Sequence, residues 1–374
     1  MRSANSAAIA LAFGTSLTDA ALPKKFFNTH HHLLDTANNT FSTFLQSLLG
    51  NMSYLPENYA ESVVEPVKAA GVEWLGSIHM EMLPGNNPGD GPSEVAWIQS
   101  LVDDGKYDAK GIVGSCDLSA DDAMTCLTDL KAASPLLVGV RWVLLRWLFP
   151  RNGGKDLLQG GVDGGVLPSF EKGYAALADH NLTFDMQCEV NQLPSFFELA
   201  SRYPDIPVCI NHLGRPAIVW GVNDTEANQT AISEWRTNMK AMASLSHVYV
   251  KISMLGHIVP NWIADEDREA LVKQMVLETV ALFGPERCIV NFNWWLNAAV
   301  SDSDFFGSVG PEPVEFLQKT MSWFQNYTEE EKEWLYWKSA ETFYLRTDED
   351  KGSKEEDKGT KEEDKGTKEE DKGT

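Results

Sequence analysis

The chain has 374 residues, of which 43% are hydrophobic and 23% charged, a composition typical of soluble globular proteins. Its formal net charge of −23 repels phosphate backbones and anionic lipid, so we expect no nucleic-acid partner. No apolar run reaches the roughly 20 residues that span a bilayer, so we expect no membrane span. The length fits one large domain or two small ones and leaves the oligomeric state open.

The N-terminal segment 1–23 is either an extension or a signal peptide, because Met1 and Arg2 precede a short apolar run. Triplets of the form Asn-x-Ser/Thr, which can accept N-linked glycans, exceed the number expected by chance. Together these features favour a secretory or extracellular location and a glycoprotein over a cytoplasmic protein. The triplets begin at Asn38, Asn51, Asn181, Asn223, Asn228 and Asn326. The five cysteines include no C-x-x-C motif, and we expect them to be buried, unpaired side chains.

Short apolar runs alternate with longer amphipathic stretches along the chain, a pattern typical of strand–helix units. Strands are predicted at 25–33, 72–82, 110–117, 136–145, 182–189, 207–213, 247–255 and 287–294. Helices are predicted at 57–70, 93–104, 119–133, 168–180, 191–203, 224–244, 266–283, 311–325 and 328–345. Eight such units predict an α/β fold of the (β/α)8 TIM-barrel type. An open doubly wound sheet is the alternative, but the first strand runs into three histidines and not into a glycine-rich turn.

The C-terminal segment 347–374 differs in composition from the rest of the chain. It contains repeats of the heptad K-E-E-D-K-G-T and has no apolar position that could form a coiled-coil seam. We therefore expect a disordered, acidic, low-complexity tail. The barrel domain is predicted to span residues 24–346.

Histidines near the ends of two predicted strands are the first candidate site residues. Side chains alternate along a strand, so His30 and His32 are expected on one face together with Asn28, and His31 on the other. His212 ends the sixth strand, just before a Gly-x-Pro turn. Active sites of TIM barrels form at the carboxyl ends of the strands. We therefore expect the imidazoles of His30, His32 and His212 to meet in one pocket at that rim.

Further polar residues close otherwise apolar strands and are expected at the same rim. Arg141 could bind a substrate carboxylate through two hydrogen bonds, or it could form an ion pair with Glu81; both interpretations stay open. Gln187, His79 and Trp294 are candidate substrate-binding residues alongside Arg141. Asn293 is near the end of the last predicted strand, where its amide would line the pocket, and Glu81 is the best available carboxylate for proton transfer.

From about Phe26 to Arg346 the chain resembles the amidohydrolase-related family, in the lactonase branch that includes 2-pyrone-4,6-dicarboxylate lactonase and L-fuconolactonase. The resemblance rests on an ordered set of short motifs, which is more specific than any one of them. They are T-H-H-H-L at 29–33, G-S-I-H-M-E at 76–81, G-V-R at 139–141, N-H-L-G-R-P at 211–216, V-K-I-S at 250–253, F-G-P-E-R-C at 283–288 and S-A-E-T-F-Y at 339–344.

The resemblance implies a distorted (β/α)8 barrel that hydrolyses a small lactone or related cyclic ester. It carries the family's histidines over to His30, His32 and His212, and its arginine to Arg141. Some relatives use a divalent metal, so these histidines would ligate an ion such as zinc if one is bound. The family's usual aspartate after the last strand is replaced here by Asn293, which cannot act as a base.

We therefore predict a hydrolase acting on a small-molecule lactone or carboxylated ester, with His30, His32, His212, Asn293 and Glu81 in catalysis. Two alternatives stay open. The barrel could have lost catalysis and act as a ligand-binding protein, which the asparagine favours. It could also be a metal-dependent decarboxylase, against which the same asparagine counts, because such relatives generally keep the aspartate as a metal ligand.

Overall fold

The structure is a computed structural model that describes residues 21–85, 87, 89–216, 225–259, 262–293 and 311–346. Nearly all of the predicted N-terminal segment and the whole repeat tail lie outside these residues. The described part contains the region predicted to form the barrel domain.

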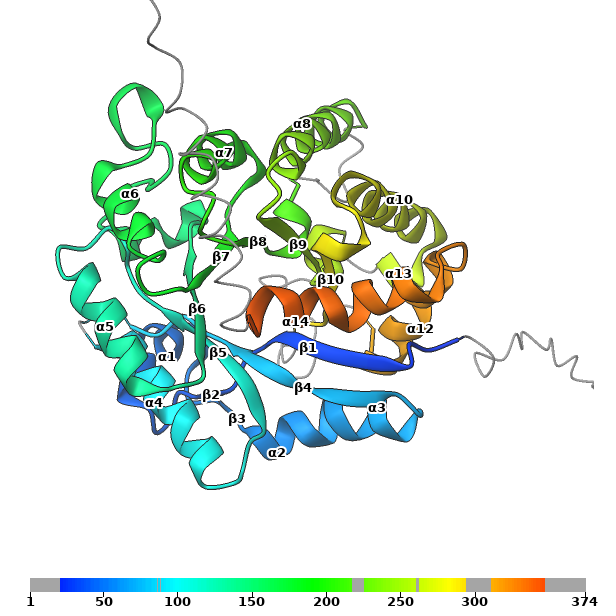
Figure 1. Cartoon of the computed structure of the whole chain (residues 1–374), viewed down its shortest axis with the longest axis horizontal. Coiled ribbons are helices and arrows are strands. Elements are labelled where there is room, and N and C mark those ends of the chain that lie inside the picture. Colours follow the sequence, from blue (N-terminus) through cyan, green and yellow to red (C-terminus); the bar gives the residue numbers. More distant parts are fainter. Residues whose placement is uncertain are drawn as a thin grey trace, which may run out of the picture.

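Eight parallel strands form one curved sheet, as the alternation of apolar and amphipathic stretches predicts (Figure 1). Their order in the sheet follows the chain, so each strand pairs with the next along the sequence. The strands are β1 (Lys25–His31), β4 (Glu73–Met80), β5 (Ala109–Ser115), β6 (Leu137–Val143), β7 (Thr183–Gln187), β8 (Val208–Ile210), β9 (Val248–Ile252) and β10 (Cys288–Val290). With its surrounding helices the sheet is a distorted (β/α)8 barrel.

Helices follow the strands and cover the outside of the sheet. The longer ones are α4 (Asp90–Asp103), α5 (Ala123–Ala133), α6 (Pro168–Ala175), α7 (Leu193–Arg202), α8 (Thr225–Ala243), α10 (Glu266–Phe283) and α12 (Pro313–Trp323). The shorter ones are α1 (Thr43–Leu49), α2 (Pro56–Tyr59), α3 (Glu65–Ala69), α9 (Leu255–Ile258), α13 (Glu329–Glu333) and α14 (Ser339–Tyr344). β2 (Leu34–Asp35) and β3 (Ser53–Tyr54) form a separate antiparallel pair.

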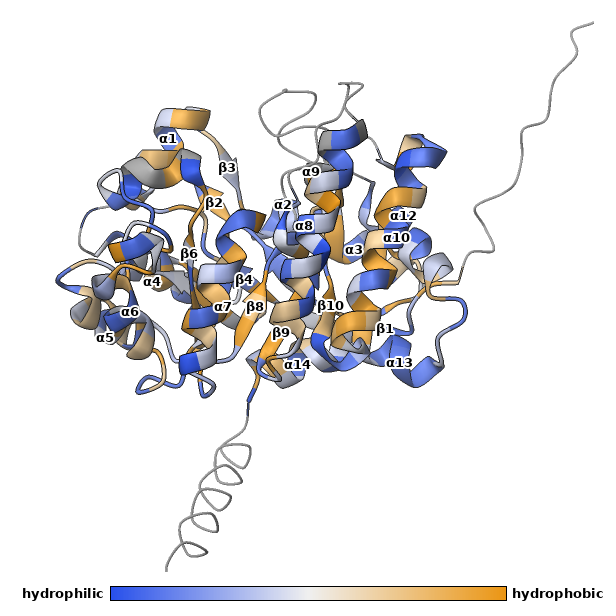
Figure 2. Ribbon diagram, turned by 90° about the horizontal axis from the view of Figure 1, so that it is seen from above, coloured by the Kyte–Doolittle hydropathy of each residue, from blue (hydrophilic) through white to orange (hydrophobic). Residues whose placement is uncertain are grey.

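The hydropathy of these elements follows their position in the fold. Figure 2 shows hydrophobic residues concentrated along strands such as β8, β9 and β10, and hydrophilic residues over much of α8 and α13. Within the described residues, no helix is both long and apolar enough to cross a membrane.

The inside of the barrel has its own apolar cluster, which forms the floor below the rim. Phe27, Ile78, Met80, Val113, Cys209 and Ile289 point inward from different strands and pack with Phe343 and Tyr344 of α14. Figure 1 shows α14 beside β1 and β10. The C-terminal helix therefore closes one end of the barrel, and polar side chains occupy the space nearer the carboxyl ends of the strands.

The asparagine side chain of Asn291 joins the last strand to the first. Its Oδ1 accepts a hydrogen bond of 2.6 Å from the Thr29 backbone N–H, and its Nδ2 donates to Thr29 Oγ1 at 3.1 Å. Two residues on, the Asn293 backbone N–H donates to the His30 carbonyl at 3.0 Å. A buried side chain thus replaces ladder hydrogen bonds at the seam between β10 and β1.

Two observations bear on the predicted secretory location. Cys116 and Cys126 form a disulfide, which corrects the expectation that all five cysteines are unpaired. Cys188, Cys209 and Cys288 are buried free thiols, as expected. Disulfides are typical of proteins that fold in oxidising compartments. The location and the N-glycosylation stay predictions.

Replacing Asn291 with alanine should destabilise the barrel. The change leaves the buried Thr29 N–H without its acceptor, which costs about 1–3 kcal/mol of unfolding free energy. Denaturant unfolding followed by circular dichroism measures this loss. Asn326→Ala, at an exposed position, is the control and should stay within about 0.5 kcal/mol of the wild type. Equal stability of the two variants would show that the seam does not depend on this side chain.

Candidate active site

A bulge in β1 decides which histidines face the inside of the barrel. The pairing of β1 with β4 shifts register between Asn28 and His31, so simple alternation fails there. Asn28 donates a hydrogen bond to the Tyr59 hydroxyl, and His31 stacks on the ring of the same tyrosine at 4.0 Å. Both therefore lie outside the barrel, which corrects the expectation that Asn28 shares a face with His30 and His32.

The structure brings His30, His32 and His212 together, although they come from distant parts of the chain. The ring centroid of His30 lies 5.2 Å from that of His32 and 4.7 Å from that of His212. Their exposed fractions are 0%, 3% and 2%. Nδ1 of His212 forms a 2.8 Å hydrogen bond with the Ser253 hydroxyl, which fixes the orientation of that ring. The three imidazoles form a single buried cluster.

Arg141 lies beside this cluster in a buried ion pair with Glu81, one of the two interpretations that the sequence left open. Its Nε donates to Glu81 Oε1 at 2.6 Å, and its Nη2 donates to the Glu81 carbonyl at 2.6 Å. The other Glu81 oxygen accepts from the Leu83 N–H at 2.8 Å. Nη1 remains as the edge of the guanidinium that faces His30 Nε2 and Gln187 Oε1, each at 3.3 Å.

The contact between Arg141 and His30 fixes the position of the proton on His30. A guanidinium has five N–H donors and no acceptor, so His30 Nε2 must be the acceptor. Burial lowers the pKa of His30 well below its usual value, and the charge of Lys251 and the other neighbours lower it further. His30 is therefore neutral, with its proton on Nδ1. That buried Nδ1–H has no hydrogen-bond partner among the described residues.

His32 is held from both sides. Its Nδ1 lies 2.9 Å from the Met80 carbonyl, which can only accept, so Nδ1 carries the proton. Burial lowers the pKa of His32 well below its usual value, and the Arg141 charge adds to this effect. Nε2 of the neutral ring is therefore an acceptor, and the atom 2.9 Å from it is the side-chain oxygen Oδ1 of Asn293, a second acceptor. The oxygen and nitrogen of an amide are assigned from their hydrogen bonds, so we assign the amide turned by half a turn, with Nδ2 donating to His32.

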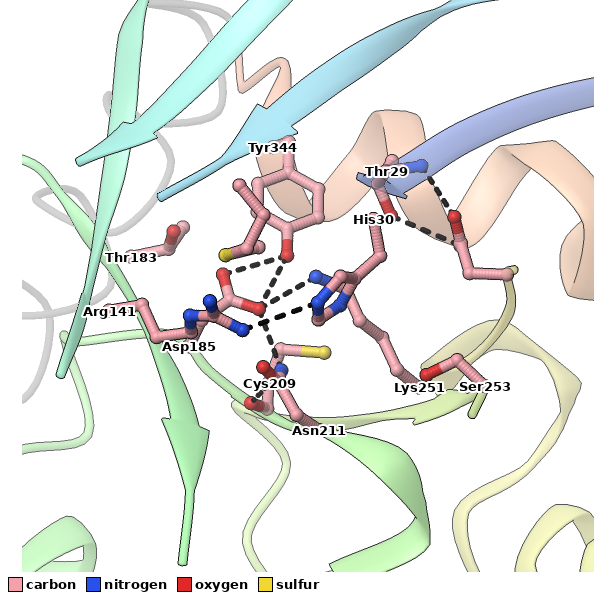
Figure 3. A network of polar contacts seen from close by, with 12 residues as sticks. Thr29, His30, Arg141, Thr183, Asp185, Cys209, Asn211, Lys251, Ser253 and Tyr344 are labelled. Carbon is pink, nitrogen blue, oxygen red and sulfur yellow. Dashed lines mark hydrogen bonds and ion pairs between the residues drawn. The ribbon is translucent and has the colours of Figure 1, made fainter. Parts of the chain in front are cut away.

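A second buried ion pair lies beside His30 and Arg141 inside the barrel (Figure 3). Lys251 Nζ donates to Asp185 Oδ1 at 2.7 Å, and both side chains are fully buried. The Tyr344 hydroxyl lies 2.8 and 2.7 Å from the two Asp185 oxygens, and Asn211 Nδ2 donates to Oδ1 at 2.8 Å. No role was predicted for this network from the sequence. The feature of the sequence that could have indicated this network is the inward position of Asp185 and Lys251 on otherwise apolar strands.

His79 does not join the cluster, contrary to the prediction that it binds substrate. It lies behind β4, where its Nε2 is 3.6 Å from Glu94 of α4 and its ring meets that of His31 at 6.1 Å. Gln187 is at the rim beside Arg141, as expected from its strand-end position. The predicted contribution of Trp294 concerns a residue outside those described.

The donor set does not fit the zinc ion that these histidines would ligate if one were bound. A metal needs ligand lone pairs that point at one open position. His30 Nε2 instead faces the cationic guanidinium of Arg141, and His32 Nε2 faces the Asn293 amide. Across the described ranges, no three His, Cys, Asp or Glu side chains are arranged to hold a metal ion. We therefore derive no chemical step through a metal.

The amidohydrolase family model matches residues 96–346 of the chain. An uncharacterized protein of Sinorhizobium fredii, y4mH, is 26% identical over 284 residues, or 74% of this chain and 86% of that protein. An L-fucono-1,5-lactonase of Burkholderia ambifaria is 28% identical over 145 residues, which cover 38% of this chain and 42% of the lactonase.

A solved structure of an amidohydrolase from Burkholderia multivorans has a similar fold. It aligns with a TM-score of 0.63 over 87% of this chain and 100% of that protein, at 20% identity. One crystal form of that protein contains HEPES and another contains zinc. At this level of identity the likeness concerns the fold.

Acidification should destabilise the folded chain because its buried imidazoles resist protonation. Burial is the largest cause that lowers the pKa of His30, His31 and His32 below the ordinary value of 6.5. The unfolded chain therefore binds more protons below about pH 6.5. The free energy of unfolding should fall as the pH drops below that value, by up to about 1.4 kcal/mol per pH unit for each imidazole.

Denaturant unfolding between pH 7.5 and 5.5 measures this slope. His31→Gln removes one of the three groups and leaves the cluster of His30, His32 and His212 intact, so it should reduce the slope. Asn326→Ala, at an exposed position without a titratable side chain, is the control and should leave the slope unchanged. The same slope in all three proteins would contradict the assignment.

Proposed function

Because the chain belongs to the amidohydrolase family, we propose that it hydrolyses the ester bond of a small lactone carrying hydroxyl or carboxylate groups. One observation carries this proposal: the Nδ1–H of His30 has no partner among the described residues, and the ring of His30 lies 4.7 Å from that of His212, which Ser253 orients. Hydrolysis of an ester needs a donor for the developing oxyanion and a base for water, and these two rings supply both. The similarity to L-fucono-1,5-lactonases supports a sugar lactone as one substrate class.

The proposed reaction begins when the lactone carbonyl oxygen accepts a hydrogen bond from His30 Nδ1–H. Water attacks the carbonyl carbon while His212 takes its proton, and the oxyanion is stabilised by His30. The tetrahedral intermediate then expels the ring oxygen, which receives the proton from His212. The product is the open hydroxy acid. His30 suits this role because the single proton of its neutral ring is on Nδ1, which has no other partner among the described residues.

The remaining residues position these groups and the substrate. Nη1 of Arg141 is the edge that a substrate carboxylate or hydroxyl would meet, and Gln187 flanks it. Both Glu81 oxygens are engaged, so we assign Glu81 to hold Arg141 and not to transfer protons. His32 and Asn293 hold one another at the seam of the barrel.

His212→Ala should lose about 10²–10⁴-fold in kcat on the lactone that the wild type opens fastest, because the base for water is gone. The assay follows acid release from a panel of neutral and carboxylated lactones, with protein dialysed against a chelator. His180→Ala, outside the barrel, is the matched control and should keep full activity. Full activity in His212→Ala, or an inactive wild type on the whole panel, contradicts the proposal.

A ligand-binding barrel without catalysis is the second candidate, and a specific observation favours it. Glu81 and Asp185 are both in buried ion pairs, and Asn293 stands where relatives carry an acid, so neither inward carboxylate is available as a base. Under the hydrolase proposal, Asn293→Asp should reduce activity by about tenfold or more. The introduced carboxylate would face the Nε2 lone pair of neutral His32. Both groups are hydrogen-bond acceptors, so they repel each other and the existing hydrogen bond is lost.

The binding candidate gives the opposite expectation. There, Asn293→Asp would supply the missing base and create esterase activity that the wild type lacks. The same lactone panel measures both outcomes. Asn291→Asp is not a suitable control, because Asn291 supports the seam between β10 and β1. Asn326→Asp, at the surface, serves instead and should behave as the wild type.

A further inference from the structure

The end of β4 and the segment after it carry two groups of the site. We call residues 80–85, which begin with the last residue of β4, the strap. The Met80 carbonyl accepts from His32 Nδ1, and Glu81 holds the guanidinium of Arg141. At its far end, the Gly85 N–H donates to the Phe41 carbonyl at 2.6 Å. The path of the strap therefore sets the orientation of one imidazole and of the arginine.

A buried carboxylate holds the middle of the strap from outside the barrel. Oε1 of Glu94, in the first turns of α4, accepts a 2.7 Å hydrogen bond from the Met82 N–H and lies 3.6 Å from His79 Nε2. Glu94 is only 3% exposed, and among the described residues its Oε2 has no hydrogen-bond partner. A carboxyl group is costly to bury, so its place at the strap needs a reason.

The helix that carries Glu94 is a fixed reference for the strap. Gly91 of α4 lies so close to β5 that a Cβ there would be 1.9 Å from the Ser115 carbonyl oxygen. α4 is thus seated directly against the end of β5. Because Met82 directly follows Glu81, a hydrogen bond from its N–H to a fixed acceptor limits the movement of Glu81 and of the Met80 carbonyl.

We propose that Glu94 is a positioning residue for the active site, acting through the Met82 N–H to align the Met80 carbonyl with His32 and Glu81 with Arg141. His79 completes the arrangement by facing the same carboxylate oxygen from β4. This inference rests on the proposed function for the roles of His32 and Arg141, but the contacts that carry it do not involve the substrate.

Three substitutions separate positioning from charge. Glu94→Gln keeps the length and the acceptor oxygen, and it should retain nearly full activity. Glu94→Asp keeps the charge but withdraws the oxygen from Met82, and Glu94→Ala removes it. Both should lose activity, with Glu94→Ala down by about 10²-fold in kcat/KM, a loss typical of misplaced catalytic groups. Glu269→Ala is the matched control, because Glu269 is a half-buried carboxylate that binds Lys319 and Trp323 far from the strap.

A second readout needs no substrate. In wild type and Glu94→Gln, the His32 Nδ1–H bound to the Met80 carbonyl should give a slowly exchanging imidazole proton signal by NMR. That signal should broaden or vanish in Glu94→Asp and Glu94→Ala and persist in Glu269→Ala. Thermal unfolding shows which variants are folded, and the pair Glu94→Gln and Glu94→Asp suffices if Glu94→Ala is not.

The outcomes distinguish the two proposals. A persistent His32 proton signal in folded Glu94→Asp, or a loss of activity and signal in Glu94→Gln equal to that in Glu94→Asp, overturns the positioning role. If the wild type opens no lactone but the signal follows the expected order, the proposed hydrolysis fails while the role of Glu94 stands.

Discussion

The arrangement of the site depends on a buried guanidinium that can donate hydrogen bonds but never accept them. A guanidinium has five N–H donors and no acceptor, so each neighbour of Arg141 must supply an acceptor or a negative charge. Glu81 gives both, through its side chain and its carbonyl. His30 can meet the remaining edge only through a lone pair. The tautomer of His30, and with it the direction of its single proton, therefore follows from its contact with the arginine.

Two buried ion pairs explain how the barrel keeps neutral imidazoles in its interior although the chain as a whole is acidic. Arg141 with Glu81, and Lys251 with Asp185, place balanced charges inside the barrel. Each carboxylate is committed to its cation, and removal of one partner would leave an uncompensated buried charge. The positive charges of Lys251 and Arg141 lower the pKa of His30 and so oppose its protonation. The chemistry available is therefore hydrogen-bond donation and proton transfer by neutral imidazole, with little scope for a free carboxylate.

The sequence predicts the barrel well because its signal is periodic, and it predicts the site only in part. The eight strands lie within the predicted ranges or within one residue of them, and His212 is at the expected strand end. Alternation failed at Asn28 because a bulge shifts β1, and a bulge depends on the pairing with β4. His79 faces α4 for a related reason, since which face of a strand is inside depends on register. Asp185 and Lys251 could be recognised as inward polar residues, but their pairing joins strands that are not neighbours.

Asn293 can be understood from the contacts of His32 and not as a defect of the site. The Met80 carbonyl binds Nδ1 of His32, so the opposite nitrogen of the neutral ring needs a donor. A carboxamide can donate there, whereas a carboxylate could do so only by retaining a proton or by forcing His32 to become charged beside Arg141. The neutral state of His32 therefore depends on a donor at position 293, and asparagine supplies it. The same contact explains the poor fit to a metal ion, because the nitrogen that would ligate it is already used within the protein.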